Sequence, residues 1–240
     1  NMKRECFLFD VDGTLTDACK PIEHDFSQYF ERWIAFHPTY LVSGSKFSQI
    51  QYQVGQDIID GCRGVFSCMG NEYRRGESFI YQNKLNLKSE VYDFLLSKLE
   101  NSPWSVRAEP HFEERSGMLN FSIVGRGADF ELRSEYKKWD RENRERETIA
   151  EEFNSSFSKR YNLEALVGGE ISLDIQQIGK DKGQIIDHLD YDNYIFFGDK
   201  CHSGGNDYNL YIKCHEKWEV ESYHQTFSIL KTNYERQNAK

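Results

Sequence analysis

The chain has 240 residues, with 30 Lys and Arg against 39 Asp and Glu, and therefore a formal net charge of −9. This length predicts one large domain or two small ones, and an aromatic content of 15% can supply a sizeable core. The acidic balance argues against generic nucleic-acid binding, and no apolar run approaches the roughly 20 residues that a membrane helix needs.

The ends of the sequence have the pattern of a parallel sheet. Apolar runs at 6–9, 40–42, 65–67 and 194–197 are short enough for buried strands, and helical stretches are expected between strands, among them 46–60 and 181–189. Polar or glycine-containing segments follow the first, second and last of these runs. Strands that alternate with helices predict an α/β sheet with its functional site at the carboxyl ends of the strands.

The middle of the sequence has a different pattern. Segments 104–127 and 164–177 alternate between apolar and polar residues, and a highly charged helical stretch at 129–159 separates them. Such alternation is typical of an antiparallel sheet with one wet face. We therefore expect an α/β core at 1–79 and 179–240, interrupted by an α+β insertion at 80–178.

The six cysteines form no recognisable metal or disulfide pattern. No Cys-x-x-Cys pair occurs, and Cys201-His202 with Cys214-His215 does not complete a zinc site. The chain is also too long and too poor in cysteine for a disulfide scaffold. We expect reduced thiols and a cytoplasmic protein.

Two aspartates follow the first apolar run, in the segment Asp10-Val11-Asp12-Gly13-Thr14. A turn would explain Asp-Gly, but a turn does not need two carboxylates at the end of a buried strand. Carboxylates at such a place are costly unless a cation neutralises them. Mg²⁺ is held by one or two carboxylates and keeps room for substrate phosphate.

The segment DVDGTLT after an apolar strand resembles the first motif of the haloacid dehalogenase (HAD) superfamily of phosphotransferases. The resemblance implies a Rossmannoid parallel-sheet core with an inserted cap. It also implies that Asp10 is the nucleophile, forming an aspartyl-phosphate, and that Asp12 is the general acid/base. A carboxylate nucleophile divides one difficult transfer into two easier ones.

Three further segments resemble the remaining motifs of the superfamily. Gly198-Asp199-Lys200 with Gly204-Gly205-Asn206-Asp207 resembles the acidic fourth motif, and Lys182 matches the lysine that offsets the charge of nucleophile and phosphate. The implied Mg²⁺ site contains Asp10, the main-chain carbonyl of Asp12, Asp199 and, in an outer shell or through water, Asp207. Ser43-Gly44-Ser45 lies where the phosphate-binding hydroxyl belongs, and which serine serves stays open.

Segments in the middle of the chain resemble one family within this superfamily. The segments FEERSGMLN, Gly125-Arg126, Arg133 and GGEISLD resemble the cap of the eukaryotic-type phosphomannomutases, which are HAD enzymes. The resemblance implies that the cap binds the substrate: the non-transferring phosphate through Arg115, Arg126 and Arg133, and the sugar hydroxyls through Ser172 and Asp174. Ser172 and Asp174 are two apart on an expected strand and so share a face.

The same resemblance implies cofactors and partners. These are Mg²⁺, a hexose 1,6-bisphosphate activator, a hexose phosphate substrate and a second copy of the chain bound through the cap. Neither a nucleic acid nor a membrane is an expected partner.

Two positions depart from the family pattern. The mutases carry a substrate-contacting arginine nine residues after the nucleophile, where this chain has Cys19 followed by Lys20. The neighbouring lysine can replace a point charge but not a bidentate fork. An acidic residue of a second, structural cation site is replaced by Lys213, so we do not expect that site.

The sequence is compatible with three functions. The first is a phosphomannomutase that interconverts mannose 1-phosphate and mannose 6-phosphate through Asp10. The second is a sugar-phosphate phosphatase with the same nucleophile, favoured by Cys19 and opposed by the full set of cap residues. A non-catalytic binding protein is disfavoured, because Asp10, Asp12 and Asp199 are all retained.

Overall fold

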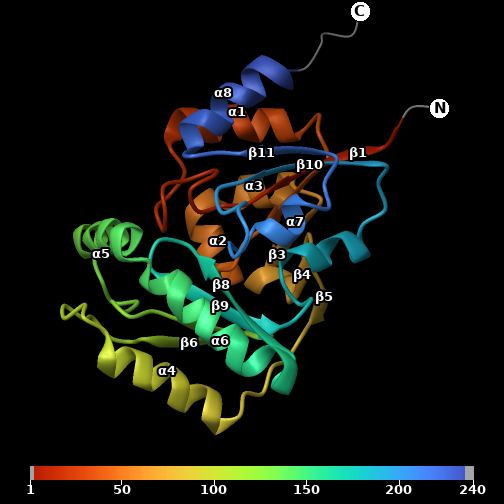
Figure 1. The fold of residues 1–240 in the computed structure, drawn as a ribbon. Coiled ribbons are helices and arrows are strands. Elements are labelled where there is room, and N and C mark those ends of the chain that lie inside the picture. The colour runs from red at the N-terminus through yellow and green to blue at the C-terminus, as the bar shows by residue number, and fades with distance from the viewer. Residues whose placement is uncertain (1–2, 236–240) are drawn as a thin grey trace, which may run out of the picture.

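The computed structural model describes residues 3–235, which form a seven-stranded sheet and a separate four-stranded sheet (Figure 1). The larger sheet has the order β11-β10-β1-β2-β3-β4-β5. Its strands are β1 (Glu5–Phe9), β2 (Thr39–Val42), β3 (Gly64–Ser67), β4 (Glu72–Arg75), β5 (Ser78–Gln82), β10 (Asn193–Gly198) and β11 (Glu216–Glu219). The strands from β11 to β3 are parallel, and β4 and β5 extend the sheet in antiparallel fashion.

Helices cover both faces of the larger sheet, which confirms the predicted α/β core. One face is covered by α1 (His24–Ile34), α2 (Phe47–Val54), α3 (Gln56–Gly61) and α8 (Tyr223–Asn233). Figure 1 shows α1 and α8 side by side, and Phe26 of α1 stacks on Phe227 of α8. The other face is covered by the 3₁₀ helix η2 (Lys182–His188) and by α7 (Tyr208–Tyr211), and a short turn, η1 (Cys68–Gly70), joins β3 to β4.

The smaller sheet is antiparallel, as expected from the alternating segments. Its order is β6-β7-β9-β8, with β6 (Phe112–Arg115), β7 (Met118–Phe121), β8 (Leu163–Gly168) and β9 (Ser172–Gln177). α4 (Ser89–Asn101), α5 (Phe130–Asn143) and α6 (Glu145–Tyr161) enclose a second apolar core on one face. The opposite face turns toward the larger sheet, where Met118 and Leu166 pack on Cys68 and Met69.

Several expected elements have different bounds. The helix expected at 46–60 is broken at Gly55, whose φ of 83° lies outside the helical region. The charged stretch at 129–159 forms α5 and α6 rather than one helix, because Arg144 between them is left-handed with φ 56°. Strand structure within 104–127 is limited to β6 and β7, and the segment at 181–189 is 3₁₀ rather than α-helical.

The expected boundary at residue 80 falls within β5, which pairs with β4 in the larger sheet up to Gln82. The chain therefore leaves this sheet after residue 82 and returns to it at β10. We retain "core" for the part with the larger sheet and "cap" for the part from α4 to β9, while the division into domains at 80 and 178 stays a prediction.

Candidate active site

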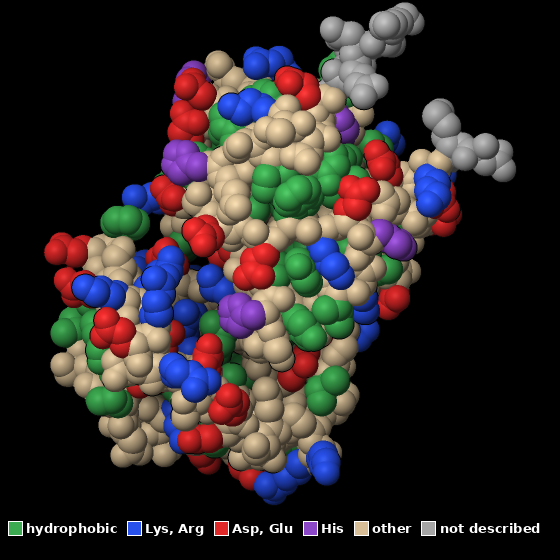
Figure 2. All heavy atoms as spheres, turned by 45° about the horizontal axis from the view of Figure 1, so that its top comes forward, with side chains coloured by type: hydrophobic (Ala, Val, Ile, Leu, Met, Phe, Trp, Pro, Cys, Tyr) green, Lys and Arg blue, Asp and Glu red, His purple; other side chains and the backbone are tan. Residues whose placement is uncertain are grey.

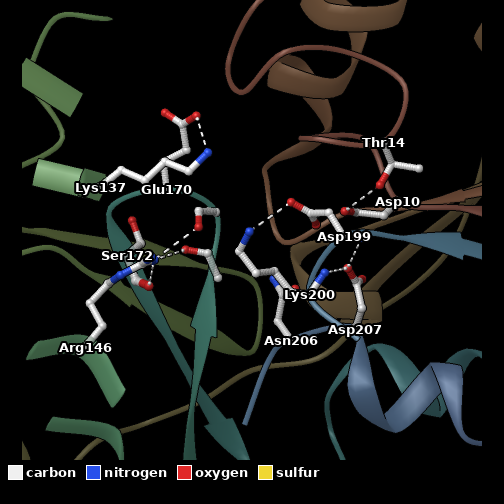
Figure 3. A network of polar contacts seen from close by, with 12 residues as sticks. Asp10, Thr14, Lys137, Arg146, Glu170, Ser172, Asp199, Lys200, Asn206 and Asp207 are labelled. Atoms are coloured by element: carbon white, nitrogen blue, oxygen red, sulfur yellow. Dashed lines mark hydrogen bonds and ion pairs between the residues drawn. The ribbon is translucent and has the colours of Figure 1, made fainter. Parts of the chain in front are cut away.

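Three carboxylates meet at the carboxyl end of the parallel strands. Asp10 follows β1 and Asp199 follows β10, which pair in register from Glu5 with Asn193 to Phe9 with Phe197, so both aspartates leave the sheet side by side. Asp207 joins them from the loop before α7, and carboxylate oxygens of the three lie within 4.8 Å of one another. Figure 3 shows this group facing the cap.

Lysines neutralise part of this charge. Lys182 is fully buried, and its Nζ lies 2.8 Å from Asp10 Oδ1 and 2.8 Å from Asp207 Oδ1. Lys200 Nζ lies 3.0 Å from Asp199 Oδ2. Burial and the Asp207 carboxylate raise the pKa of Asp10 well above its usual range, although Lys182 opposes the shift. Although burial alone would lower the pKa of Lys182, the carboxylates of Asp10 and Asp207 raise it.

The carboxylate group fits a hard divalent cation. Its ligand atoms are all oxygen, and two of its three residues are buried. Asp12 does not contribute its side chain: its Oδ1 accepts hydrogen bonds from Gln53 Nε2 at 2.5 Å and from the Cys19 N–H at 3.0 Å. Asp12 is thus held apart from the three clustered carboxylates, as a separate acid/base would need to be.

Gly13 makes the approach of the two loops possible. Its φ is 76°, and a Cβ at this position would lie 2.3 Å from Asp199 Oδ2. Any side chain would therefore displace the Asp199 carboxylate. The glycine in DVDGT is explained by this contact with the last core strand, rather than by a turn alone.

The serine segment lies beside this group at the end of β2. Ser43 is buried, and its Oγ accepts the Ser45 N–H at 3.0 Å, which leaves its own proton free for a ligand oxygen. Ser43, Gly44 and Ser45 line the same cavity as Asp10 and Lys182. The arrangement favours Ser43 as the hydroxyl donor, and the role itself stays a prediction.

The cap contributes the opposite wall of this cavity. Ser172 and Asp174 on β9 both line it, whereas Leu173 between them packs in the helix-covered core of the cap, as the alternation predicts. Asp174 accepts Asn120 Nδ2 from the cap and Asn206 Nδ2 from the core, both at 3.0 Å. Arg146 secures the β8–β9 turn by donating to the carbonyls of Gly168, Gly169 and Ser172 (Figure 3).

Three arginines of the cap reach the cavity from different elements. Arg115 comes from β6, Arg126 from the loop after β7, and Arg133 from the first turns of α5. Arg133 donates to the carbonyls of Ala128 and Arg126 at 2.8 Å, so it points inward and does not belong to the solvated face of the charged helix. The structure therefore brings every predicted site residue except Asp207 into the lining of one cavity, and Asp207 contacts Lys182 directly behind it.

Cys19 also lines the cavity, with its Sγ 3.5 Å from Arg133 Nη1. Lys20 does not line it: its Nζ lies 3.5 Å from the ring centre of Phe130, on the outer end of α5. The neighbouring lysine therefore does not take the place of the missing arginine.

The cavity is small, because the cap is closed on the core. Its volume is about 50 Å³, far below the roughly 300 Å³ of small ligand sites. Val167 of β8 donates to the Gly204 carbonyl and accepts from the Asn206 N–H, each at 2.9 Å. Arg115 Nη1 donates to the Gly44 carbonyl at 2.6 Å. With these contacts in place, the cavity is too small for a sugar phosphate.

A model of the family described as eukaryotic phosphomannomutase matches residues 29–235. The chain belongs to this family. The phosphomannomutase of Schizosaccharomyces pombe (strain 972 / ATCC 24843) is 33% identical over 217 residues, which cover 85% of this chain and 84% of that protein. Phosphomannomutase 2 of Dictyostelium discoideum is 30% identical over 240 residues, which cover 95% of this chain and 96% of that protein.

Solved structures with a similar fold include a phosphatase domain and a nucleotidase. The C-terminal domain of the trehalose-6-phosphate phosphatase of C. albicans superposes with a TM-score of 0.63 at 17% identity, covering 98% of this chain and 79% of that one. The N-terminally truncated, IMP-bound IMP-nucleotidase of Plasmodium falciparum superposes with a TM-score of 0.63 at 14% sequence identity. The superposition covers 95% of this chain and 68% of that one. At these identities the likeness concerns the fold alone. The HAD-type fold of this phosphomannomutase family member, and its place in an enzyme family of the isomerase type, are thereby confirmed.

A separate cleft of this family member also reaches the clustered carboxylates. Figure 2 shows Lys and Arg side chains gathered at a hollow beside α5, where a cleft of about 700 Å³ reaches Asp12 and Asp199. The cleft is lined by charges of both signs, which are the cations Lys137, Arg141 and Lys200 and the anions Glu170, Glu219 and Glu221.

Within residues 3–235, no helix has the length and apolar character needed to cross a membrane.

Sequence patterns missed three residues of this phosphomannomutase-family site. Gln53 binds the Asp12 carboxylate, Asn120 binds Asp174, and Glu113 pairs with two of the arginines. Asn120 and Glu113 lie within the FEERSGMLN segment on which the resemblance to the cap rests. Their place in this segment could have identified them as site residues, although their residue types alone could not. Gln53 lies in an ordinary helix, and nothing in its sequence context distinguishes it.

Proposed function

We propose that this chain is a magnesium-dependent phosphomannomutase that interconverts mannose 1-phosphate and mannose 6-phosphate through an aspartyl-phosphate on Asp10. The observation that carries the proposal is the two-sided cavity. On the core side Asp10 lies beside Lys182 and two further aspartates, and on the cap side three arginines face the same space. One wall is suited to transfer a phosphoryl group, and the other to hold a second phosphate.

The chemistry follows from the positions of Asp10 and Asp12. Asp10 first carries the phosphoryl group as an aspartyl-phosphate. In the first half-reaction, the free hydroxyl of the hexose monophosphate gives its proton to Asp12 and its oxygen attacks phosphorus, so the bond from phosphorus to Asp10 breaks and the hexose bisphosphate forms. In the second half-reaction, an oxygen of Asp10 attacks the other phosphorus, the bond from that phosphorus to the sugar oxygen breaks, and Asp12 returns the proton to this oxygen. Gln53 and the Cys19 N–H hold Asp12 in one orientation for both steps.

The residues around Asp10 supply charge neutralisation. Lys182 contacts the nucleophile and remains protonated, because its pKa is raised by Asp10 and Asp207. Asp10, Asp199, Asp207 and the main-chain carbonyl of Asp12 would hold Mg²⁺, which when bound neutralises the phosphoryl oxygens. Ser43 and the segment that follows it would donate to the same oxygens. Phosphoryl transfer depends mainly on such positioning and charge stabilisation.

The cap would serve the two orientations of the substrate. A hexose 1,6-bisphosphate formed between the half-reactions must turn so that either phosphate can meet Asp10. Arg115, Arg126 and Arg133 would bind whichever phosphate is distal, while Ser172 and Asp174 bind sugar hydroxyls. The same bisphosphate supplied in trace amount would act as activator, by phosphorylating Asp10.

The test uses purified protein with Mg²⁺, mannose 1-phosphate and a trace of glucose 1,6-bisphosphate. We expect mannose 6-phosphate to form without matching release of inorganic phosphate. The Asp10→Asn variant removes the nucleophile while keeping its shape, so all turnover should disappear although the protein stays folded by circular dichroism. Stoichiometric phosphate without isomer would contradict the mutase, and an active Asp10→Asn variant would contradict the nucleophile.

A second candidate is a HAD-type sugar-phosphate phosphatase with the same nucleophile. Cys19 favours it, because a neutral thiol lines the cavity where the mutases carry an arginine. A site that holds the bisphosphate less firmly loses it more often, and water then attacks the aspartyl-phosphate. The ratio of isomer to inorganic phosphate in the assay above distinguishes the two candidates.

A further inference from the structure

Glu113 lies behind the arginines of the cap and contacts two of them. Its Oε1 is 2.7 Å from Arg115 Nε, and its Oε2 is 3.4 Å from Arg126 Nε. Glu113 and Arg115 are two apart on β6 and so share a face, while Arg126 reaches them from the loop after β7. One carboxylate thus joins two guanidinium groups that come from different elements.

The two guanidinium groups need such a partner. Arg115 has a side chain only 4% exposed, and Arg126 is 19% exposed. Burial and the charge of Arg115 lower the pKa of Arg126, whereas Glu113 raises it. Burial opposes ionisation of Glu113, but Arg115 and Arg126 overcome this and lower its pKa. The carboxylate therefore stays charged and counters the repulsion between the arginines.

The contacts leave particular donors free. Glu113 binds the Nε atom of each arginine. Arg115 Nη1 donates to the Gly44 carbonyl, and Arg126 Nη1 donates to the Asn120 and Ser172 side chains. Within residues 3–235, the hydrogen bonds of these two guanidinium groups involve Nε and Nη1, and none involves Nη2. Both side chains line the cavity, so these donors are available to a ligand oxygen.

We propose that Glu113 is a positioning residue for the phosphate-binding arginines, fixing the planes of Arg115 and Arg126 so that they bind a phosphate dianion together. The inference rests on the proposed function, which places the distal phosphate at these arginines. Holding the guanidinium groups in place before binding lowers the ordering cost when the phosphate arrives. Alternatively, the Glu113 carboxylate could compete with the phosphate for the arginines and weaken its binding. Removal of the carboxylate would raise the Kd for a phosphate ligand in the first case and lower it in the second.

The experiment measures binding without turnover. In an Asp10→Asn background, calorimetry gives the Kd for glucose 1,6-bisphosphate, which presents one phosphate to the cap in either orientation. Glu113→Ala should raise this Kd about tenfold or more, as expected for loss of about 1.4 kcal/mol of pre-organisation. Glu113→Gln keeps one acceptor for Arg115 and should lie between. In the active chain, Glu113→Ala should raise KM with little change in kcat.

The matched control is Glu114→Ala. Glu114 is the next residue of β6, is exposed, and binds the Tyr92 hydroxyl on the opposite face of the strand. Its substitution should leave both Kd and KM unchanged.

The outcomes separate this proposal from the proposed function. An unchanged Kd in Glu113→Ala overturns the positioning role, and a lower Kd shows that the carboxylate competes with phosphate instead. Isomerase turnover by the unaltered chain is independent of either result. Failure of the Asp10→Asn protein to bind the bisphosphate at all would contradict both proposals.

Discussion

Cys19 is the residue at which the cavity differs most from the family pattern. Its thiol lies 3.5 Å from Arg133 and contributes no charge, while the Lys20 ammonium is held over Phe130 instead of in the cavity. The core side of the substrate space therefore lacks a cation at this position. During reorientation, the bisphosphate would be held there less firmly than in a chain with arginine.

Replacement of Cys19 by arginine should increase isomerisation relative to hydrolysis. A guanidinium group supplies a bidentate donor, and we expect the ratio of mannose 6-phosphate to inorganic phosphate to rise severalfold, since one charge-assisted hydrogen bond contributes about 1.5–3 kcal/mol before desolvation is counted. Cys19→Ser is the control, because it changes the thiol without adding charge. An unchanged ratio in Cys19→Arg would mean that Arg126 and Arg133 already provide the needed cation.

At the scale of single residues, the sequence predicted the groups with a strong motif and missed those that act through them. Asp10 and Asp199 could be proposed because carboxylates directly after buried strands are unusual. Lys182 was proposed through its match to the family motif and its position before the last core strand, because a lysine at the start of a helix is commonplace. Gln53 could not, because an amide on a helix acquires its role only when the fold brings it 2.5 Å from Asp12. The inward orientation of the Arg133 side chain also could not be predicted, because the charge-dense helix around it is typical of a solvent-exposed face.

Between elements, the junction of β8 with the start of η2 contains two carboxyl groups. Burial and the neighbouring Asp181 raise the pKa of Glu164 from about 4.5 to about 8. Glu164 belongs to the cap, and Asp181 caps η2, the helix that carries Lys182. The fold therefore favours the protonated form of Glu164. The stability from this form is fully present below about pH 4.5 and is lost as the pH rises through about 8.

The Glu164→Gln variant should reveal this dependence, because glutamine stays neutral at every pH. We expect its Tm advantage over the unaltered chain to grow between about pH 5 and 8 and then to level off. Glu151→Gln on the exposed face of α6 is the control and should show a constant difference. Parallel Tm curves for Glu164→Gln and the unaltered chain would show that Glu164 is ionised in the fold.

Elements were predicted well where hydrophobic pattern decides them and less well where a single backbone angle does. The apolar runs that became β1 and β10 have no alternative to burial. The break between α5 and α6 depends on Arg144 in a left-handed conformation, which arginine rarely adopts, and the flanking helical charge pattern continues through it. The hairpin of β4 and β5 carried no strong signal, since β5 is an edge strand with exposed side chains.

At the scale of the whole molecule, closure of the cap determines what can react with Asp10. The cavity beside Asp10 has a volume of only about 50 Å³, although the cleft of about 700 Å³ reaches the neighbouring Asp12 and Asp199. An aspartyl-phosphate that meets water would be hydrolysed. One contact that holds the cap closed lies outside the cavity. Lys20 of the core lies over the ring of Phe130 at the start of α5, and this ring is 54% exposed.

Removal of that contact should favour the open state and so increase hydrolysis. An exposed cation–π contact contributes about 0.5–1 kcal/mol, which corresponds to a two- to fivefold shift between open and closed forms. We expect Phe130→Ala and Lys20→Ala to lower the ratio of mannose 6-phosphate to inorganic phosphate by about this factor. Phe79→Ala is the control, because Phe79 is similarly exposed and its cation–π partner, Arg74, also belongs to the core, so this contact does not join core to cap. If the two substitutions across the contact had different effects, the change would arise from α5 or the loop alone, and closure would not depend on this contact.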